Sequence, residues 1–193
     1  FHESELHADG SVADIIEKLK ASGYTYEQEG ALWFRSSELG DEKDRVLVRA
    51  NGVPTYFVPD IAYHYNKLAV RNFDKAVDIF GADHHGYIPR MKAAMTALGI
   101  DPNKLDIVIM QMVNLVRNGE KYKLSKRSGK AITLSTLLEE IPIDAARFFF
   151  NLREPNSHFD FDLDLAVEQS SQNPVYYVPV SYTHLRAHET TLH

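Results

Sequence analysis

The stretch that decides the fold is Ala76-Val-Asp-Ile-Phe-Gly-Ala-Asp-His-His-Gly86. It begins with a short apolar run, which predicts a buried strand, and it breaks at a turn bounded by glycines, Gly81–Gly86. We expect a helix from about Ile88 to Leu98 and a second apolar strand over 106–113. Strand, glycine turn, helix and strand form the βαβ unit of a parallel sheet, in which ligands bind at the carboxyl ends of the strands.

A basic segment, Lys121-Tyr-Lys-Leu-Ser-Lys-Arg-Ser-Gly-Lys130, follows the second of these strands. It combines five cations with Ser125 and Gly129, a composition that suits a loop closing over phosphates. The ordinary alternative is a solvated charged loop, and the segment taken by itself does not decide between the two. Its position after a buried strand, at the ligand-binding edge of the expected sheet, favours an anion site.

Length and composition exclude several classes of protein. The 193 residues suffice for one domain, or for one domain and part of a second. The absence of cysteine excludes disulfides and thiolate metal sites. No apolar run approaches the roughly 20 residues of a membrane span and there is no signal-peptide pattern, so we expect a cytoplasmic protein with no membrane partner. The net charge of -6 argues against a general coat for nucleic acid.

The region before Ala76 is expected to hold a helix and a small antiparallel sheet. Apolar residues at helical spacing predict a helix from Ser11, with Gly23 as its stop. Runs rich in aromatic and β-branched residues predict strands, and Asn51-Gly52 marks a tight turn between two of them. The strands are expected within 24–35, over 45–49 and over 55–58.

Asp60 has two compatible interpretations. Pro59 is expected to end the last of these strands, and a helix over 61–68 follows, so Asp60 lies where a carboxylate is an ordinary N-cap. Tyr56 lies four residues earlier, and a phenol and a carboxylate together would clamp a guanidinium or an ammonium group. The pattern of residues leaves both interpretations open.

The turn Asp83-His84-His85 raises the question of a metal site, with His64 as a further ligand. Adjacent histidines in one short turn rarely reach the same ion, and no pair with the HExxH spacing is present. We therefore predict no metal site. A turn that hydrogen-bonds a small ligand is favoured, because Gly81 and Gly86 allow close approach to the backbone.

The carboxyl-terminal part has helical patterns over 134–140, over 143–152 and over 163–177, the last interrupted at Pro174. Thr133 and Ser135 are candidate caps for the first helix. From about residue 144 onward the pattern is helical only, which predicts a boundary to an all-helical domain. Residues 179–193 have no apolar periodicity, so we assign no function to their histidines.

Several motifs resemble those of class I aminoacyl-tRNA synthetases. Lys123-Leu-Ser-Lys-Arg127 resembles the KMSKS signature, with Leu124 in the methionine position, and Gly81-Ala-Asp-His84 resembles the GxD[QH] turn. A wider set covers about residues 1–178 and resembles bacterial-type arginyl-tRNA synthetases. That set is Asp44-Arg-Val-Leu-Val48, Pro54-Thr-Tyr-Phe57, Asp60-Ile-Ala-Tyr-His-Tyr-Asn-Lys67, Gly81–Tyr87, Arg147-Phe-Phe-Phe150, Phe159-Asp-Phe-Asp162 and Asn173-Pro-Val-Tyr-Tyr177.

The resemblance implies an α/β fold: the second half of a Rossmann-like parallel-sheet catalytic domain with a small antiparallel β insertion, followed by the start of an α-helical domain. The implied division is a partial catalytic domain over 1–143, with the insertion at about 24–58, a helical tRNA-binding domain beginning over 144–178, and an atypical, foreign-looking tail over 179–193. The implied activity is ATP-dependent ligation of L-arginine to tRNA(Arg) through an arginyl-adenylate. ATP with Mg²⁺ is then a substrate, no cofactor is tightly bound, and the intact enzyme is expected to be a monomer.

The resemblance also implies a role for individual residues. Lys123, Ser125 and Lys126 match the loop that stabilises the departing pyrophosphate, Lys126 being expected to matter most. The residues implied to bind arginine are Tyr56, Asp60 and His84. The residues implied to lie beside ATP are Gly81, Asp83, Gly86, Val113, Asn114 and Lys126.

Two departures from the family pattern qualify these expectations: the HIGH signature is missing, and residues 179–193 do not resemble the helix that follows Val178 in the family. The other ATP signature of the class, HIGH, does not occur in the 193 residues, and His85-Gly86 stands in the wrong context for it. The first residue is Phe1, so we expect a fragment that lacks the first half of the catalytic domain and is inactive alone. The alternatives are a non-catalytic module that binds a nucleotide or tRNA, and a histidine-dependent metal protein.

Overall fold

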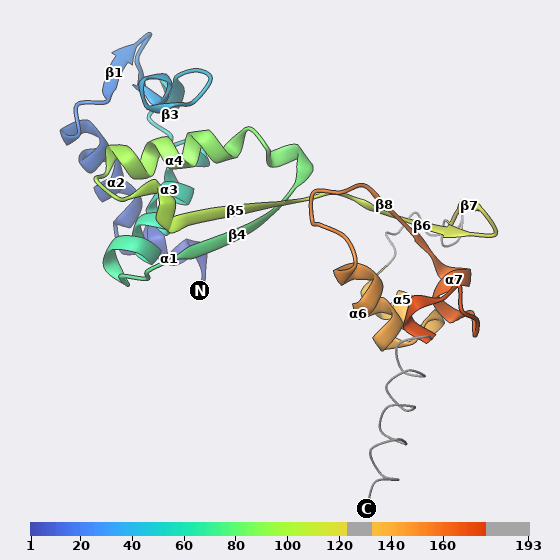
Figure 1. Cartoon of the computed structure of the whole chain (residues 1–193). Helices are drawn as coiled ribbons and strands as arrows, with labels where there is room; N and C mark the ends of the chain where they lie inside the picture. The colour runs from blue at the N-terminus through green and yellow to red at the C-terminus, as the bar shows by residue number, and fades with distance from the viewer. Residues whose placement is uncertain (123–132, 177–193) are drawn as a thin grey trace, which may run out of the picture. The chain divides into compact units, whose positions relative to one another are not determined.

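The computed structural model describes residues 1–122 and 133–176. The chain divides into two compact units, Phe1–Ile109 and Met110–His193, which we call the first and the second unit. Figure 1 shows the elements of each unit in chain order. Each unit has a hydrophobic core of its own, so each is described by itself.

The first unit consists of helices around two small sheets. Its helical elements are α1 (Glu3–Ala8), α2 (Ser11–Ala21), η1 (Ser36–Leu39), α3 (Phe57–Tyr65), the π-helical turn η2 (Asn66–Val70), η3 (Ala82–His84), α4 (Tyr87–Ala97) and η4 (Pro102–Lys104). Its strands are β1 (Thr25–Gln28), β2 (Ala31–Phe34), β3 (Arg45–Val48), β4 (Ala76–Gly81) and β5 (Leu105–Met110).

The βαβ unit predicted around Ala76–Gly86 is confirmed, but the prediction that its first strand is buried is wrong, because Val77 and Ile79 are 57% and 65% exposed. Strands β4 and β5 pair in one sheet, and α4 connects them. Figure 1 shows both strands running in the same direction, with α4 returning between them. The second predicted strand is too long, because β5 ends at Met110 and a separate strand begins at Val113. The turn 81–86 therefore follows the carboxyl end of β4, the edge at which parallel sheets bind ligands.

The small antiparallel sheet is confirmed for two of its three predicted parts. Strands β1, β2 and β3 pair in that order, with Thr25 opposite Phe34 and Trp33 opposite Val46. The predicted strand over 55–58 is wrong, because α3 begins at Phe57. Pro59 lies in the first turn of this helix, where a missing N–H costs no hydrogen bond, so it does not end a strand.

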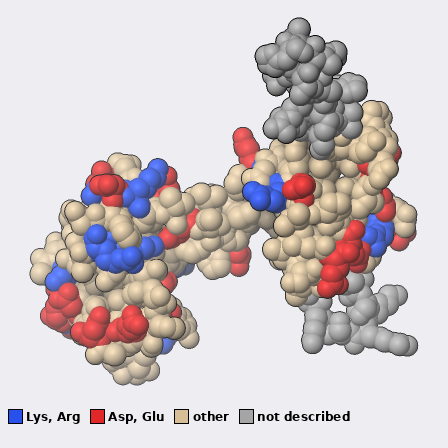
Figure 2. Space-filling model, turned by 90° about the horizontal axis from the view of Figure 1, so that it is seen from below, with Lys and Arg blue, Asp and Glu red and all other residues tan. Residues whose placement is uncertain are grey.

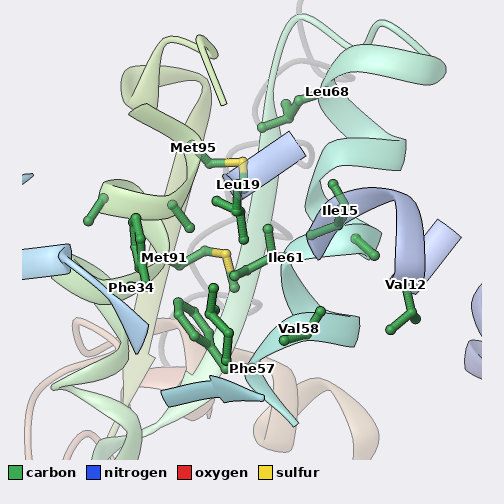
Figure 3. Close-up of a cluster of buried hydrophobic side chains, with 14 of the residues drawn as sticks. Val12, Ile15, Leu19, Phe34, Phe57, Val58, Ile61, Leu68, Met91 and Met95 are labelled. Atoms are coloured by element: carbon green, nitrogen blue, oxygen red, sulfur yellow. The ribbon is translucent and has the colours of Figure 1, made fainter. Parts of the chain in front are cut away.

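The core of the first unit explains why residues 57–65 are helical. Phe57, Val58 and Ile61 have helical spacing, and all three are buried. Figure 3 shows their side chains directed toward those of α2 and of α4. Burying side chains of this kind contributes about 1.5–3 kcal/mol each, which outweighs the strand preference of a short Thr-Tyr-Phe-Val run.

The second unit combines a three-stranded sheet with short helices. Its elements are β6 (Val113–Arg117), β7 (Glu120–Lys121), α5 (Leu134–Glu140), α6 (Ile143–Asn151), β8 (Phe159–Asp162) and α7 (Leu163–Val167). Strand β6 pairs with β7 in antiparallel fashion and with β8 in parallel. The helices predicted over 134–140 and 143–152 are confirmed, and Thr133 is the N-cap of the first.

Two predictions for the carboxyl-terminal part are wrong. The chain after residue 144 is not helical only, because β8 lies beside β6, with Phe161 fully buried. The helix predicted over 163–177, with an interruption at Pro174, is broken earlier: α7 ends at Val167, where the backbone of Glu168 is extended, and residues 174–176 are helical again. The Asn173 side chain donates to the carbonyl oxygen of Glu168 at 2.8 Å and stabilises this non-helical path. The domain boundary at 143/144 stays a prediction, and residues 179–193 lie outside the described ranges.

Helices long and apolar enough to cross a membrane do not occur among the residues that the structure describes.

Candidate active site

The carboxylate of Asp60 forms the centre of a site in the first unit. Asp60 lies in the first turn of α3, but the N-cap position belongs to Tyr56 and no side chain caps the helix. The N-cap interpretation of Asp60 is therefore wrong. Its Oδ2 atom instead accepts a short hydrogen bond from the hydroxyl of Tyr87, the first residue of α4.

Tyr87 is held by aromatic neighbours. Its ring meets that of Phe57 edge to face at 6.2 Å and that of Phe80 at 5.6 Å between centroids. The guanidinium carbon of Arg90 lies 5.6 Å from the centre of the Tyr87 ring. Burial, followed by the hydrogen bond to Asp60, raises the pKa of Tyr87 far above its ordinary value. The phenol therefore stays protonated and acts as a fixed donor to Asp60.

Asp60 has no cationic partner in the part of the chain that the structure describes. The ion pairs among residues 1–122 and 133–176 do not include it. Its side chain is partly buried, and Tyr87, the hydrogen-bond partner of the carboxylate among the described residues, is neutral. A partly desolvated carboxylate without a cation binds a positively charged ligand group favourably.

A second network holds the backbone of Asp60. Nδ1 of His64 donates to the carbonyl oxygen of Asp60 at 2.7 Å, and its Nε2 makes a short bond to Asp78 of β4. The Nζ atom of Lys67 donates to the other oxygen of Asp78 at 2.8 Å. Burial raises the pKa of the Asp78 carboxyl, but the bonds from His64 and Lys67 outweigh burial and lower it from 3.8 to about 2. Asp78 is thus an anion that fixes α3 to β4.

The turn after β4 is open to solvent. The side chain of Asp83 is 83% exposed and that of His84 is 55% exposed, and the two meet at 3.1 Å. A Cβ atom at Gly81 would lie 2.9 Å from Oδ1 of Asp83, an exposed side chain that can move aside, so the geometry of the turn does not itself require glycine there. Nothing lies within 4 Å of the corresponding position at Gly86. The exposed backbone of this turn is available to a ligand at the carboxyl end of β4.

The structure brings together only some of the residues predicted to bind arginine. Tyr56 precedes Asp60 by one helical turn, is 84% exposed and makes no side-chain hydrogen bond among the described residues. The partners that the sequence analysis missed are Tyr87, His64 and Asp78. One signal for them was present, because Asp60, His64 and Lys67 follow each other at four and three residues and so share one face of a helix. Nothing in the sequence pairs Asp60 with Tyr87.

A separate cavity of about 540 Å³ lies in the second unit, and its lining is mostly apolar. Val113 and Asn114, which were predicted to contact adenine, are among its lining residues. Asn114 is held by a hydrogen bond of 2.8 Å from its Nδ2 to Asp160 of the neighbouring strand. Tyr122 also lines the cavity and donates to Glu140 at 2.8 Å. A mostly apolar cavity of this size can accommodate a planar base.

The predicted phosphate-binding residues Lys123, Ser125 and Lys126 lie outside the described residues. For the metal alternative, no group of three His, Asp or Glu side chains within 1–122 and 133–176 lies close enough together to hold an ion.

Comparison with known proteins places the chain in a family. The family profile "tRNA synthetases class I (R), catalytic domain" matches residues 2–190. The chain belongs to this family. Arginine–tRNA ligase of Acetivibrio thermocellus is 57% identical over 182 residues, which are 94% of this chain and 32% of the relative. Arginine–tRNA ligase of Caldanaerobacter subterraneus is 56% identical over 186 residues, 96% of this chain and 33% of the relative. The chain thus spans about one third of the length of these curated relatives.

Solved structures agree with this placement. A Campylobacter jejuni structure described as an arginyl-tRNA synthetase matches with a TM-score of 0.86 and 43% identity, over 98% of this chain and 40% of that one. The Thermus thermophilus arginyl-tRNA synthetase matches with a TM-score of 0.74 at 20% identity, over 94% of this chain and 40% of that one, and supports the fold alone. The predicted fold class, part of a class I synthetase catalytic domain, is confirmed.

Proposed function

We propose that this chain is part of an arginine–tRNA ligase and carries the side of its active site that recognises the arginine side chain. The observation that carries the proposal is Asp60, a partly buried carboxylate with a neutral hydroxyl partner and no ion pair among the described residues. A guanidinium would supply the missing charge and donate two parallel N–H bonds to one carboxylate. Tyr56 and His84, exposed near the ends of α3 and β4, are then available for further contacts with arginine.

Further residues of this chain are proposed to contact ATP. The apolar cavity lined by Val113 and Asn114 suits the adenine of ATP. The turn that holds Gly81, Asp83 and Gly86 offers open backbone at the carboxyl end of β4. Mg²⁺ enters as part of the ATP substrate, and Lys123, Ser125 and Lys126 are proposed to stabilise the phosphates.

The proposed chemistry has two steps. A carboxylate oxygen of arginine attacks the α-phosphorus of ATP, the bond from this phosphorus to the bridging oxygen breaks, and pyrophosphate leaves. The 2′-hydroxyl of the terminal adenosine of tRNA(Arg) then attacks the arginyl carbonyl carbon and gives up its proton, and AMP leaves with the electrons of the broken carbon–oxygen bond. Cations near the pyrophosphate lower the barrier of the first step, because negative charge builds up there in the transition state. Asp60 and its neighbours contribute by positioning the arginine.

The whole protein is proposed to act as a cytoplasmic monomer on tRNA(Arg). Figure 2 shows groups of basic and groups of acidic side chains on each of the two units. The net charge of the chain is -6. Contact with tRNA is therefore expected to depend on local basic groups rather than on a general positive field.

The test is ATP–pyrophosphate exchange, with arginine and tRNA present, by the full-length protein that carries this chain. Asp60→Asn keeps the shape of the side chain but removes its charge. We expect the KM for arginine to rise about 10²–10⁴-fold, because a lost buried charge partner costs about 3–5 kcal/mol, while the KM for ATP is unchanged. Asp106→Asn is the matched control, since Asp106 is an exposed aspartate of the same unit that pairs with Lys75.

An unchanged KM for arginine in Asp60→Asn would contradict the assignment of Asp60. The 193-residue chain alone is expected to give no exchange. If the full-length protein also gives none but still binds ATP or tRNA, the alternative of a non-catalytic binding module replaces the proposal.

A further inference from the structure

The aromatic surroundings of Tyr87 leave its ring little freedom. Phe57 and Phe80, from α3 and β4, both meet this ring nearly at right angles, with interplanar angles of 80° and 90°. Edge-to-face pairs at this separation are favourable, and they restrict rotation of the ring. The hydroxyl oxygen of Tyr87 therefore occupies a position set by two other elements of the unit.

The carboxylate of Asp60 has an intrinsically soft torsion. The last side-chain torsion of aspartate, between a tetrahedral and a planar carbon, has broad minima, so an unsupported carboxylate samples a wide range of planes. The hydrogen bond from Tyr87 to Oδ2 fixes one of the two oxygens. His64 and Asp78 fix the backbone of the same residue, through the bond of 2.7 Å from Nδ1 of His64 to the Asp60 carbonyl oxygen. Both ends of the Asp60 side chain are therefore located.

The plane of the carboxylate matters for a guanidinium more than for a point charge. Guanidinium is a planar fork whose two parallel bonds require a coplanar carboxylate, whereas an ammonium group binds a carboxylate from many directions. A neutral donor such as tyrosine occupies one lone pair of Asp60 and leaves its charge for the ligand. An arginine in the place of Tyr87 would fix the plane as well but would neutralise the charge of Asp60.

We propose that Tyr87 is a positioning residue for arginine recognition, which sets the plane of the Asp60 carboxylate without neutralising its charge. This inference rests on the proposed function, because it takes Asp60 as the group that binds the guanidinium. Tyr87 acts through Asp60 and is not assigned a contact with the substrate.

The experiment is a double-mutant cycle in the full-length protein, measured as kcat/KM for L-arginine in ATP–pyrophosphate exchange. Tyr87→Phe keeps the ring and removes the hydroxyl. We expect it to lower kcat/KM for arginine about 10-fold, mainly through KM, because one hydrogen bond to a charged group is lost, and to leave the KM for ATP unchanged. In protein that already carries Asp60→Asn, the same change is expected to have an effect of less than about 3-fold, since the carboxylate it orients is gone.

Tyr26→Phe is the matched control, because the hydroxyl of Tyr26 also donates to an aspartate of the first unit, Asp44, at 3.1 Å. It is expected to leave both KM values unchanged. Equal effects of Tyr87→Phe with and without Asp60→Asn would overturn the inference, because they would mean a purely structural role. If Asp60→Asn lowers kcat/KM and Tyr87→Phe does not, the inference alone fails. If Asp60→Asn itself has no effect, the assignment of Asp60 to arginine binding is wrong, and the inference about Tyr87 is overturned with it.

Discussion

Two aspartates of the first unit, Asp41 and Asp60, have opposite surroundings. Asp41 is buried and receives two hydrogen bonds from the guanidinium of Arg45, at 2.7 and 2.8 Å, and one of 3.0 Å from Ser36. Asp60 is partly buried, and its carboxylate has the Tyr87 hydroxyl as its protein partner in the described residues. The fold supplies a guanidinium to the first carboxylate and leaves the second without one.

This difference distinguishes a structural aspartate from a binding aspartate. Burial raises the pKa of Asp41, but the bonds from Arg45, Ser36 and the backbone N–H of Glu42 outweigh burial and lower it overall. Its charge is fully compensated within the chain, so Asp41 has nothing to offer a ligand. The Asp60 carboxylate is held by one hydrogen bond from a neutral group, so its charge is available. The Asp41–Arg45 pair also shows the geometry that Asp60 and a free arginine are expected to adopt.

The largest expected effect is on stability at Asp41. Asp41→Asn leaves the guanidinium of Arg45, whose side chain is 15% exposed, without its anion, and we expect a loss of about 3–5 kcal/mol in the free energy of unfolding. Urea unfolding of the chain, followed by the fluorescence of its single tryptophan, measures this loss. Trp33 is a local probe, because it lies in β2 beside the strand that carries Arg45. In the full-length enzyme, the KM for arginine is expected not to change. A raised KM would mean that Asp41 is not purely structural.

The next largest effect is expected for a substitution that gives Asp60 a guanidinium partner like that of Asp41. Tyr87→Arg introduces a guanidinium next to the Asp60 carboxylate, and this built-in cation competes with the substrate at a high effective concentration. We expect the KM for arginine to rise about 100-fold. Tyr87→Gln is the control, since it also removes the ring but adds no charge. If both variants weaken arginine binding equally, the loss comes from the ring and not from charge compensation.

A smaller effect is expected at Asp78, which anchors α3 to β4. Asp78→Asn removes an anion that binds both His64 and Lys67, and we expect the free energy of unfolding to fall by about 2 kcal/mol. Arginine binding should weaken as well, because His64 holds the Asp60 carbonyl oxygen. Urea unfolding and exchange kinetics of the same variant test the two effects together. A loss of stability with an unchanged KM would restrict Asp78 to a structural role.

The same anchor predicts a dependence of stability on pH. The pKa of Asp78 is about 2 in the folded chain against an ordinary 3.8, so the native state holds this proton less tightly than the unfolded state. The stabilisation is complete above pH 3.8 and is lost as the pH falls through about 2. Unfolding curves at intervals from pH 5 to pH 2 should show a fall in stability that is shallower in Asp78→Asn. Identical slopes in the two proteins would contradict the ionised state of Asp78.

The smallest effect is expected for an aspartate that is both paired and exposed. Asp106 pairs with Lys75, and their side chains are 47% and 57% exposed. Asp106→Asn should change the free energy of unfolding by less than about 0.5 kcal/mol, because solvent screens the pair. The effect should disappear in 1 M salt. A larger change would mean that solvent exposure does not explain why this ion pair is expected to contribute less to stability than the Asp41–Arg45 pair.

The sequence predicted those parts of the fold that depend on local patterns. The turn after β4 and helix α4 follow from an apolar run, two glycines and helical spacing, all within about twenty residues. Residues 55–58 were misread because Thr-Tyr-Phe-Val has strand character, whereas Phe57 and Val58 gain more by packing in the core. Strand β8 was missed because its partner β6 lies some 46 residues earlier, and Phe159-Asp-Phe-Asp162 alternates for only two periods.

For the candidate site, the sequence predicted the binding residue Asp60 but not its hydrogen-bond partner Tyr87. A helix after Asp60 was predicted, but its start at Phe57 was not, so Asp60 was placed before the helix rather than within it. The family motif marked Asp60 for arginine binding. The hydrogen bond from Tyr87 joins residues 27 apart in the sequence, on different helices. A contact of this kind depends on how α3 and α4 pack, so no pattern within either helix reveals it.

The bond between Tyr87 and Asp60 also limits how the amino-acid preference of this site can be redesigned. A ligand with a neutral ureido side chain, such as citrulline, presents an oxygen where arginine presents a donor. In Asp60→Asn, the amide oxygen would accept from Tyr87, which turns the amide NH₂ group toward the ligand. The tyrosine would then select the orientation of the asparagine, so one substitution exchanges the acceptor for a donor. A redesign that also replaces Tyr87 would lose this control and leave the amide free to flip.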